Sequence, residues 1–210
     1  MESKTINYWE QVEKNPTESY KEFFDAEKKF LKENVLKNSV VLDVGCGTGE
    51  LMKLLSPIVK KITGIDNDEN AIKRCKENLK GLDNVEIFLE DAEKMHFKDN
   101  SFDVIICMGT TFDNFGKTKT KILLEIKRLL KNNGIFIFSV YNENALEEKL
   151  KIYNKYWKDF VNKREGVIVY KEVISEQFSK EQITSILKEA DFKILDIVKG
   201  GIFYLIKAEN

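Results

Sequence analysis

Residues 40–49, with the sequence Val-Val-Leu-Asp-Val-Gly-Cys-Gly-Thr-Gly, decide the fold of this chain. The aliphatic and β-branched residues of the first half are typical of a buried parallel strand. The second half places glycine at alternate positions, and glycine accepts positive φ angles and lets a backbone approach a ligand closely. The first N–H groups of a following helix would face the same crevice. The stretch therefore predicts a site for a nucleotide-like ligand at the carboxyl edge of a parallel sheet.

Strand and helix patterns alternate along the chain after this stretch. Apolar runs predict strands at 39–44, 61–66, 84–89, 102–108 and 135–140. Amphipathic patterns predict helices at 49–55, 69–79 and 117–131, the second capped by Asp68 and the third ended by the Asn-Asn-Gly of 132–134. This alternation favours an α/β fold, a doubly wound and mostly parallel sheet with right-handed crossovers.

The two ends of the chain add further elements to this core. A helix is expected over 17–36, with Thr17 as its cap and an apolar face of Tyr20, Phe23, Phe24, Phe30 and Leu31. A helix at 179–189 precedes strands at 192–198 and 202–208. The Gly-Gly pair between those strands predicts an antiparallel hairpin, so the last strand would run against the rest of the sheet. In between, residues 142–178 form an insertion, with a long helix at 143–163 and an extended segment at 167–175.

The composition is that of a globular protein. The chain has 210 residues, of which 42% are hydrophobic and 33% charged, with a net charge of −1 and a pI of about 6.1. This balance gives no overall electrostatic reason to bind nucleic acid. The first residues lack the apolar core of a signal peptide, and no apolar run approaches the ~18 residues of a membrane span. We therefore expect a cytoplasmic protein without a membrane segment.

The cysteines and the histidine indicate neither a disulfide framework nor a metal site. Cys46, Cys75 and Cys107 are too few and too far apart for a disulfide scaffold or a zinc knuckle, and we expect them to be buried free thiols. His96, the only histidine, has no histidine partner and is expected in a solvated loop. No metal ligands are predicted.

The spacing of the glycines argues against two common nucleotide sites. A dinucleotide fingerprint reads G-x-G-x-x-G, whereas here Gly45, Gly47 and Gly49 alternate, so the third glycine comes one residue early. Asp43 stands two residues before the first glycine. A phosphate-binding P-loop would need a following Gly-Lys-Ser/Thr, which is absent.

Four segments in a fixed order carry a resemblance to a known family. They are Leu-Asp-Val-Gly-Cys-Gly-Thr-Gly at 42–49, Gly-Ile-Asp at 64–66, Asp-Ala at 91–92 and Phe-Asp-Val-Ile-Ile at 102–106. In their order and spacing they strongly resemble the class I S-adenosylmethionine-dependent methyltransferases, in the small-molecule branch similar to methyltransferase types 11 and 25. The resemblance covers residues 38–140 motif by motif and residues 179–208 by general pattern. It implies a Rossmann-like seven-stranded sheet with an antiparallel last strand and helical lid additions.

The resemblance implies S-adenosyl-L-methionine as methyl donor and S-adenosyl-L-homocysteine as product. Asp43 and Gly45 would meet the ammonium of the methionine moiety, within a turn that also includes Cys46, Gly47 and Gly49. Asp66 would accept hydrogen bonds from the ribose hydroxyls, as a carboxylate can. By the same resemblance, the adenine would lie beside Asn67, Asp91 and Ala92, and the sulfonium beside Met108 and Gly109.

The acceptor is less clearly indicated. The Asn/Asp-Pro-Pro-aromatic signature of many DNA, RNA and protein methyltransferases is absent, since the chain has only Pro16 and Pro57. Residues 109–115, Gly-Thr-Thr-Phe-Asp-Asn-Phe, resemble a segment of small-molecule amine N-methyltransferases, with Thr110 in place of Asn or Ser. The candidate substrate residues are Thr110, Thr111 and Asn114 of this segment and Tyr141 after the fifth strand. A polar loop whose Phe112 packs on the cofactor is the plainer alternative.

Aromatic residues gather in the additions to the core: Tyr8, Trp9, Tyr20, Tyr153, Tyr156, Trp157, Phe160 and Tyr170. They could form an apolar cage for alkylated ammonium groups. They could equally bury the added helices against the sheet. The sequence leaves both open.

We expect one methyltransferase domain over residues 1–210. Its parts would be a helical lid at 1–37, the cofactor-binding core at 38–140, a lid insertion at 142–178 and a helix with a hairpin at 179–208. The expected function is methyl transfer to a small-molecule nucleophile, with an amine as one candidate, by in-line displacement. An RNA or protein methyltransferase and a noncatalytic cofactor-binding protein are the alternatives. The sequence identifies no catalytic base and no oligomeric state.

Overall fold

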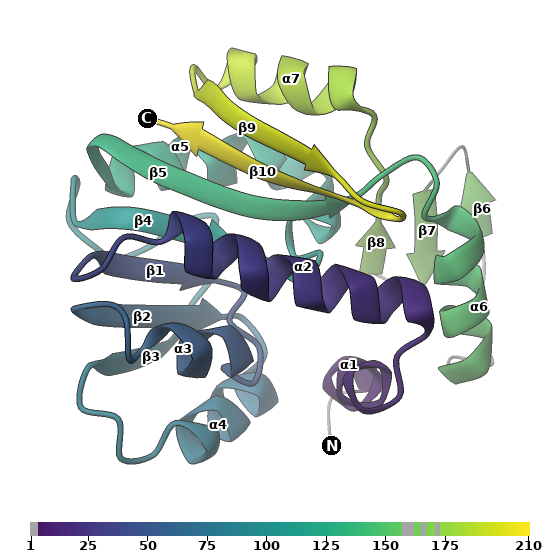
Figure 1. Cartoon of the computed structure of the whole chain (residues 1–210), viewed down its shortest axis with the longest axis horizontal. Helices are drawn as coiled ribbons and strands as arrows, with labels where there is room; N and C mark the ends of the chain where they lie inside the picture. The colour runs from purple at the N-terminus through teal and green to yellow at the C-terminus, as the bar shows by residue number, and fades with distance from the viewer. Residues whose placement is uncertain (1–3, 157–161, 165–166, 171–172) are drawn as a thin grey trace.

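The computed structural model describes residues 4–156, 162–164, 167–170 and 173–210. Their central feature is a seven-stranded sheet in the order β3-β2-β1-β4-β5-β10-β9 (Figure 1). Its strands are β1 (Val40–Val44), β2 (Lys61–Asp66), β3 (Val85–Leu89), β4 (Phe102–Cys107), β5 (Leu130–Tyr141), β9 (Lys193–Lys199) and β10 (Phe203–Glu209). The order reverses between β1 and β4, which in open α/β sheets is where ligands bind.

The first five strands of this sheet run parallel, and β10 is antiparallel to both β5 and β9. The predicted doubly wound sheet with its antiparallel last strand is therefore confirmed. The hairpin predicted at the Gly-Gly pair is also confirmed, since β9 and β10 pair directly across it.

Helices cover both faces of the sheet (Figure 1). One face packs against α2 (Glu18–Asn34), α3 (Glu50–Leu55) and α4 (Glu69–Asn78), and the other against α5 (Lys119–Leu129) and α7 (Lys180–Glu189). Within β4, Val104 and Ile106 pack on the face covered by α2, α3 and α4. Ile105 and Cys107 pack on the face covered by α5 and α7. Successive side chains of a strand point to opposite faces, so this nearly all-apolar strand is buried on both sides.

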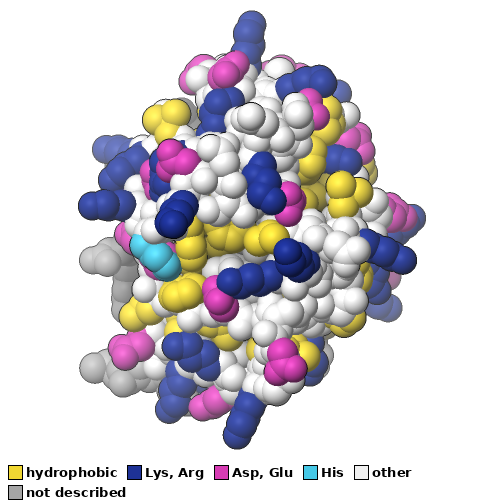
Figure 2. Space-filling view, turned by 90° about the vertical axis from the view of Figure 1, so that its left-hand side faces the viewer, with side chains coloured by type: hydrophobic (Ala, Val, Ile, Leu, Met, Phe, Trp, Pro, Cys, Tyr) yellow, Lys and Arg dark blue, Asp and Glu magenta, His cyan; other side chains and the backbone are white. Residues whose placement is uncertain are grey.

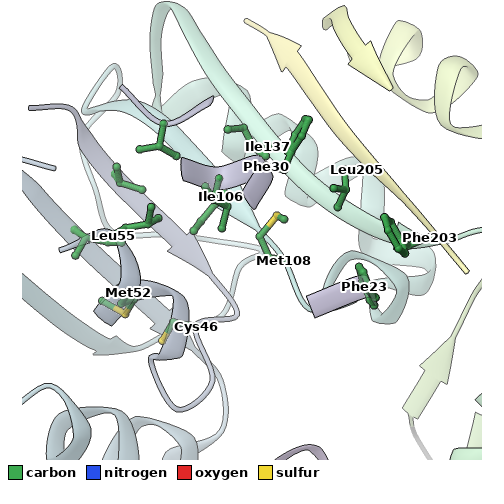
Figure 3. Packing of buried hydrophobic residues seen from close by; sticks show 14 of the residues in the cluster. Phe23, Phe30, Cys46, Met52, Leu55, Ile106, Met108, Ile137, Phe203 and Leu205 are labelled. Carbon is green, nitrogen blue, oxygen red and sulfur yellow. The ribbon is translucent and has the colours of Figure 1, made fainter. Parts of the chain in front are cut away.

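The helix α2 joins distant parts of the chain. Its apolar face packs across the sheet onto the last strand, where the rings of Phe23 and Phe203 stack with centroids 4.8 Å apart (Figure 3). The predicted helix at 17–36 is confirmed, but Thr17 makes no capping hydrogen bond. Its hydroxyl donates instead to Glu148 of α6 (Leu146–Tyr156), because the tertiary contact offers a carboxylate. A further helix, α1 (Lys4–Lys14), precedes α2.

Two predicted boundaries are wrong. The helix predicted over 117–131 begins as a 3₁₀ turn, η2 (Gly116–Thr118), and α5 ends at Leu129. The Asn-Asn-Gly segment does not end this helix, since Leu130 is already extended and pairs with Phe102. Pairing with the central strand gives the backbone hydrogen bonds that another helical turn would have supplied.

The insertion also differs from its prediction. The helix expected at 143–163 differs from the described residues at both ends, since α6 begins at Leu146 and Asn162–Arg164 form a strand, β6. A small antiparallel sheet follows in the order β6-β7-β8, built from Asn162–Arg164, Val167–Tyr170 and Val173–Ser175. Here Ile168 pairs with Ser175, so the single extended segment expected at 167–175 is two paired strands. Its β-branched residues favour pairing on two sides, which periodicity alone does not reveal.

The surface carries both signs of charge. On the face seen in Figure 2, Lys and Arg side chains are interspersed with Asp and Glu around a small group of exposed hydrophobic side chains. Within the described ranges, no helix combines the length and the apolar character that a membrane crossing requires. All three cysteines are buried free thiols, as predicted.

Candidate functional site

A cavity of about 600 Å³ opens at the carboxyl ends of β1, β2 and β4. The chain folds this way locally because parallel strands present their carboxyl ends, and the loops that follow them, at one edge of the sheet. Most of the predicted site residues lie together in its wall: Asp43, Gly45, Cys46, Gly47, Asp66, Asn67, Asp91, Ala92, Met108, Gly109, Thr111 and Asn114. Segments that are up to 71 positions apart in the sequence thus meet in one wall.

Three predicted site residues are not part of this wall. Gly49 is buried behind it, facing Cys75 and Leu79 of α4. Thr110 is 2% exposed and adopts a positive φ of 64°. Tyr141 is fully buried, and its hydroxyl lies 2.9 Å from that of Tyr20. These residues support the wall from behind rather than forming its surface.

The glycine turn after β1 requires glycine for two reasons. Gly45, Gly47 and Gly49 have φ angles of 77°, 53° and 87°, which side chains disfavour. A Cβ on Gly45 would also stand 2.4 Å from the Thr111 methyl group. The backbone N–H groups of Gly45 and Cys46 both donate to the Ile65 carbonyl at 2.9 Å. The turn is thereby fixed to the end of β2, and its remaining polar groups are held at the cavity.

Asp66 links the two turns that follow β1 and β2. Its Oδ2 accepts from the Gly47 N–H at 3.0 Å, and its Oδ1 accepts from the Asp68 N–H at 2.9 Å. Asp68 in turn caps α4, as predicted, by accepting from Asn70 and Ala71. Because each carboxylate oxygen has two lone pairs, Asp66 keeps capacity to accept hydrogen bonds from a ligand in the cavity.

Asp43 is a buried carboxyl group in the cavity wall. Only 3% of the residue is exposed. Burial, followed by the nearby charges of Asp66 and Glu27, raises its pKa to about 8. A cation arriving in the cavity would reverse this shift, since an opposite charge favours the ionised form. Asp43 is therefore suited to form an ion pair with a positive group on a ligand.

The loop after β3 supplies the far end of the cavity. Asp91 and Ala92 both line it, and Asp91 is exposed. The Asp91 side chain also accepts from the Glu93 N–H at 2.8 Å, so it stabilises its own turn. Asp91 therefore lines the cavity and stabilises its own turn at the same time. His96 lies in the same loop, as predicted, 2.8 Å from Glu90.

Sequence reasoning missed Glu27, the most buried acid of the site apart from Asp43. Glu27 lies on α2, is 3% exposed and lines the cavity. Its Oε1 accepts from the Gly109 N–H at 2.8 Å and from the Ser139 hydroxyl at 2.5 Å. A signal existed: Glu27 follows Tyr20 and Phe23 at helical spacing, so a charged residue stands within the apolar stripe of the helix.

The cavity is strongly acidic. Besides Asp43, Asp66 and Asp91, its wall contains Glu10, Glu13, Glu27, Glu50, Asp68, Glu90 and Glu93, but Lys28 is the single basic residue among the described lining residues. Lys28 forms an ion pair with Glu50 at 2.5 Å. Glu10 forms an ion pair with Arg74, and the raised pKa values of Glu13, Glu27 and Asp43 keep these three groups partly protonated at neutral pH. The other carboxyl groups, and these three once they ionise, give the cavity a negative potential that favours cationic ligands.

Tyr141 belongs to a buried polar cluster behind the cavity. Lys149 of α6 lies 4.6 Å above its ring and donates to the carbonyls of Ser175 and Glu176. The Tyr141 N–H donates to Asp113 at 3.1 Å. Burial lowers the Lys149 pKa to about 8, against the opposing charge of Asp113. This cluster fixes the insertion to the core, so Tyr141 has a structural role here.

The aromatic residues of the additions divide between the cavity and the core. Trp9 lines the cavity, whereas Tyr20 and Tyr153 are buried in the core. Some of the predicted aromatic positions fall outside what the structure describes. These are Trp157 and Phe160, and the side chains of Tyr8, Tyr156 and Tyr170. In the part of the chain that is described, no three His, Cys, Asp or Glu side chains are grouped as metal ligands would be.

Two known proteins illustrate what the chain is similar to in sequence. The chain is 30% identical over 167 residues to protein MJ1252 of Methanocaldococcus jannaschii, covering 77% of this chain and 62% of that protein. It is also 30% identical over 178 residues to the demethylmenaquinone methyltransferase of Staphylococcus aureus strain MRSA252, covering 79% of this chain and 73% of that enzyme. The chain thus spans less than two thirds of the MJ1252 length.

Structural comparison identifies the fold, and a family model identifies the family. The S-adenosylmethionine-dependent methyltransferase of Clostridium acetobutylicum superposes with a TM-score of 0.74, at 17% identity, over 98% of this chain and 97% of that one. Residues 36–191 match the methyltransferase domain family, and this match spans the strands and turns that build the cavity. The chain therefore belongs to the methyltransferase domain family and has the fold of the class I S-adenosylmethionine-dependent methyltransferases.

Proposed function

We propose that this protein transfers the methyl group of S-adenosylmethionine to a small-molecule acceptor. The observation that carries the proposal is the convergence, at one cavity of about 600 Å³, of the glycine turn, Asp66 and the loop after β3. This volume lies within the range of small-molecule sites. The family membership supports the same reading.

The residues present fit the chemistry of this methyl donor. It carries an ammonium and a sulfonium, and a cavity with ten acidic residues and one lysine in its described lining offers the opposite charge. Its ribose diol needs acceptors, for which Asp66 has lone pairs remaining. Gly45 has a positive φ and no side chain, so its backbone lines the cavity directly.

When bound, the donor supplies a methyl group on a sulfonium that is already a good leaving group. The task left to the protein is alignment of the two reactants and exclusion of water. Thr111 and Asn114 follow Met108 and Gly109 in the cavity wall, which is why we retain both as substrate contacts. Thr110 and Tyr141 would act only indirectly, by holding this segment in place.

The acceptor that the acidic lining favours is an amine. A protonated amine is attracted into a cavity of negative potential, and it must lose a proton before it can attack. A quinone-related acceptor is the second candidate, because a relative at 30% identity is named a demethylmenaquinone methyltransferase. A cytoplasmic location, a single domain over residues 1–210 and lids at 1–37 and 142–178 remain predictions.

Isothermal titration calorimetry of the purified chain with S-adenosylhomocysteine tests the binding half of this proposal. We expect a single site, and the absence of binding by a folded protein would refute the assignment. Acceptors are then tested with labelled S-adenosylmethionine against primary amines, demethylmenaquinone, carboxylic acids and tRNA. Label transfer to tRNA with steeply salt-dependent affinity would instead favour an RNA methyltransferase. Binding without any transfer would favour a noncatalytic protein.

A further inference from the structure

Among the acidic residues of α2, Glu27 alone lines the cavity, and its carboxyl group is also hydrogen-bonded to buried parts of the sheet edge. Its Oε1 accepts both hydrogen bonds, from the Gly109 N–H at 2.8 Å and the Ser139 hydroxyl at 2.5 Å. These donors come from the loop after β4 and from β5, so Glu27 is anchored at the end of the two central strands. Glu27 occupies a position in the buried apolar stripe of α2, where an apolar side chain would be expected. Burying it costs stability, which points to a role in the site.

Several charged and titratable groups face Glu27 from the elements packed around it. Those that influence its charge or are influenced by it are Glu13 of α1, Lys28 of α2, Asp43 of β1, Glu50 of α3 and Cys107 of β4. Lys28 is occupied by its ion pair with Glu50. In the ligand-free protein, therefore, Glu27 has no strong cationic partner of its own among these groups.

We propose that Glu27 is the counter-charge of the donor's sulfonium and the acceptor of the proton that the nucleophile loses. The inference rests on the proposed function and names the group that balances charge in that reaction. Its basis is the bond from the Gly109 N–H, since Met108 and Gly109 form the cavity wall where the family resemblance puts the sulfonium. It applies to any acceptor that presents an N–H or O–H group.

The charges and atoms balance in this assignment. A neutral amine nitrogen forms a bond to the methyl carbon while the carbon–sulfur bond breaks, and its electron pair stays on sulfur. The N–H proton passes to the Glu27 carboxylate. One positive and one negative charge are thereby replaced by a neutral thioether, a neutral methylamine and a neutral carboxylic acid. The product complex has lost the attraction that held the donor, which favours release of product.

The protonation of Glu27 in the empty site fits this cycle. Burial raises its pKa to about 7, against the hydrogen bonds from Ser139 and Gly109, which favour the ionised form. At neutral pH the group is thus divided between its acid and carboxylate forms. A sulfonium nearby would ionise it fully, whereas the neutral sulfur of the product would not.

Calorimetry in two buffers of different ionisation enthalpy measures this directly, without any acceptor. S-adenosylmethionine and S-adenosylhomocysteine are titrated separately at pH 7, and the number of protons released is derived for each. Because the pKa of Glu27 is about 7, we expect the sulfonium ligand to release about half a proton more than the thioether. At pH 8.5 the difference should almost vanish.

Two substitutions assign the difference to a residue. Glu27→Gln keeps acceptors for Gly109 and Ser139 but cannot ionise, so it should abolish the proton difference and lower the affinity for S-adenosylmethionine about tenfold relative to S-adenosylhomocysteine. Asp43→Asn is the matched control, another buried acid of the same wall. We expect it to weaken both ligands alike, because both carry the ammonium, and to retain the difference.

A third variant protects the test against a Glu27→Gln protein that does not fold. Ser139→Ala removes a hydrogen bond that lowers the pKa of Glu27. The proton difference at pH 7 should therefore increase above that of the wild type. With an acceptor in hand, the same rise in pKa should move the acid limb of kcat to higher pH.

Three results would overturn the proposal. One is an equal proton release for both ligands by the wild type. Another is a difference that survives Glu27→Gln, or that disappears with Asp43→Asn instead. The third is an equal loss of affinity for both ligands in Glu27→Gln, which would make Glu27 a contact of the ammonium. Failure of the proposed donor site looks different, because the wild type would then bind neither ligand, and failure of the small-molecule assignment would appear only in the acceptor assays.

Discussion

Asp66 shows, at the scale of one residue, how a single side chain fixes two turns and also lines the cavity. Its two carboxylate oxygens hold the N–H groups of Gly47 and Asp68, which fixes the turns on either side of the cavity. Burial raises its pKa, while these backbone bonds oppose the shift. A carboxylate already oriented by two turns loses little further freedom when a ligand binds.

Asp66→Ala should weaken the affinity for S-adenosylhomocysteine by roughly 1–3 kcal/mol, because the ribose hydroxyls lose a charged acceptor. Calorimetry measures the change, and circular dichroism verifies that the variant is folded. Asp103→Ala is the control, since Asp103 bonds Val40 and Lys131 at the opposite end of β4 and is absent from the cavity wall. An Asp66→Ala protein that is folded and binds like the wild type would exclude the ribose role.

Two elements determine the shape of the site at the next scale. The glycine turn forms one wall, and α2 lies across the sheet with Glu27 toward the cavity and Phe23 stacked on Phe203 (Figure 3). The helix therefore couples the packing of the last strand to the position of a carboxyl group in the site. Its apolar stripe is essential for both.

Gly45→Ala should impair ligand binding more than it impairs folding. The new Cβ would stand 2.4 Å from the Thr111 methyl group, at a φ of 77° that alanine disfavours. The turn must shift, and Thr111 with it. We expect at least a tenfold loss of affinity for S-adenosylhomocysteine. Gly81→Ala, also at positive φ but with open space around its Cβ, should retain wild-type affinity.

Phe23→Ala should lower the free energy of unfolding by about 3–5 kcal/mol, since it leaves a cavity at a fully buried ring. Urea unfolding at pH 7 gives the value. Lys29→Ala serves as the comparison, because this side chain is 75% exposed on the same helix. A loss below 1 kcal/mol for Phe23→Ala would mean that α2 contributes little to the fold.

At the scale of the whole molecule, the protein maintains an acidic cavity at a cost in stability. Asp43 and Glu27 are both more than nine-tenths buried, and both have pKa values raised above those of exposed carboxyl groups. The folded state therefore binds more protons than the unfolded state between the two sets of pKa values. The contribution of these two protonated acids to the free energy of unfolding is complete at acidic pH. It is lost as the pH rises through about 7 for Glu27 and about 8 for Asp43.

The ligand-free protein should consequently become less stable between pH 5.5 and pH 8.5, by an amount on the order of 5 kcal/mol. Thermal unfolding across this range measures the effect. The double variant Glu27→Gln/Asp43→Asn should lose much of the pH dependence and be the more stable protein at pH 8.5. A wild type that instead gains stability with rising pH would show that these two acids are ionised in the empty cavity.

The strands of the sheet, its antiparallel last strand and most of the cavity wall could be predicted because they depend on local signals. A buried strand, a turn that needs glycine and an acid at a strand end are each visible in a few neighbouring residues, as at 40–49 and 64–66. Local signals did not predict element boundaries that depend on strand pairing between distant segments. Leu130 leaves its helix to pair with Phe102, and the segment 167–175 divides into two strands.

By itself the sequence determined the sheet and its antiparallel last strand, because hydrophobic periodicity and turn glycines act over short distances. The proposed methyl donor came from the family resemblance of its motifs. Only the tertiary structure decided that Glu27 belongs to the site and that Tyr141 lies behind it. Glu27 meets Gly109 and Ser139, which are 82 and 112 residues away. Contacts at such separations exist only after the chain has packed, so no local pattern contains them.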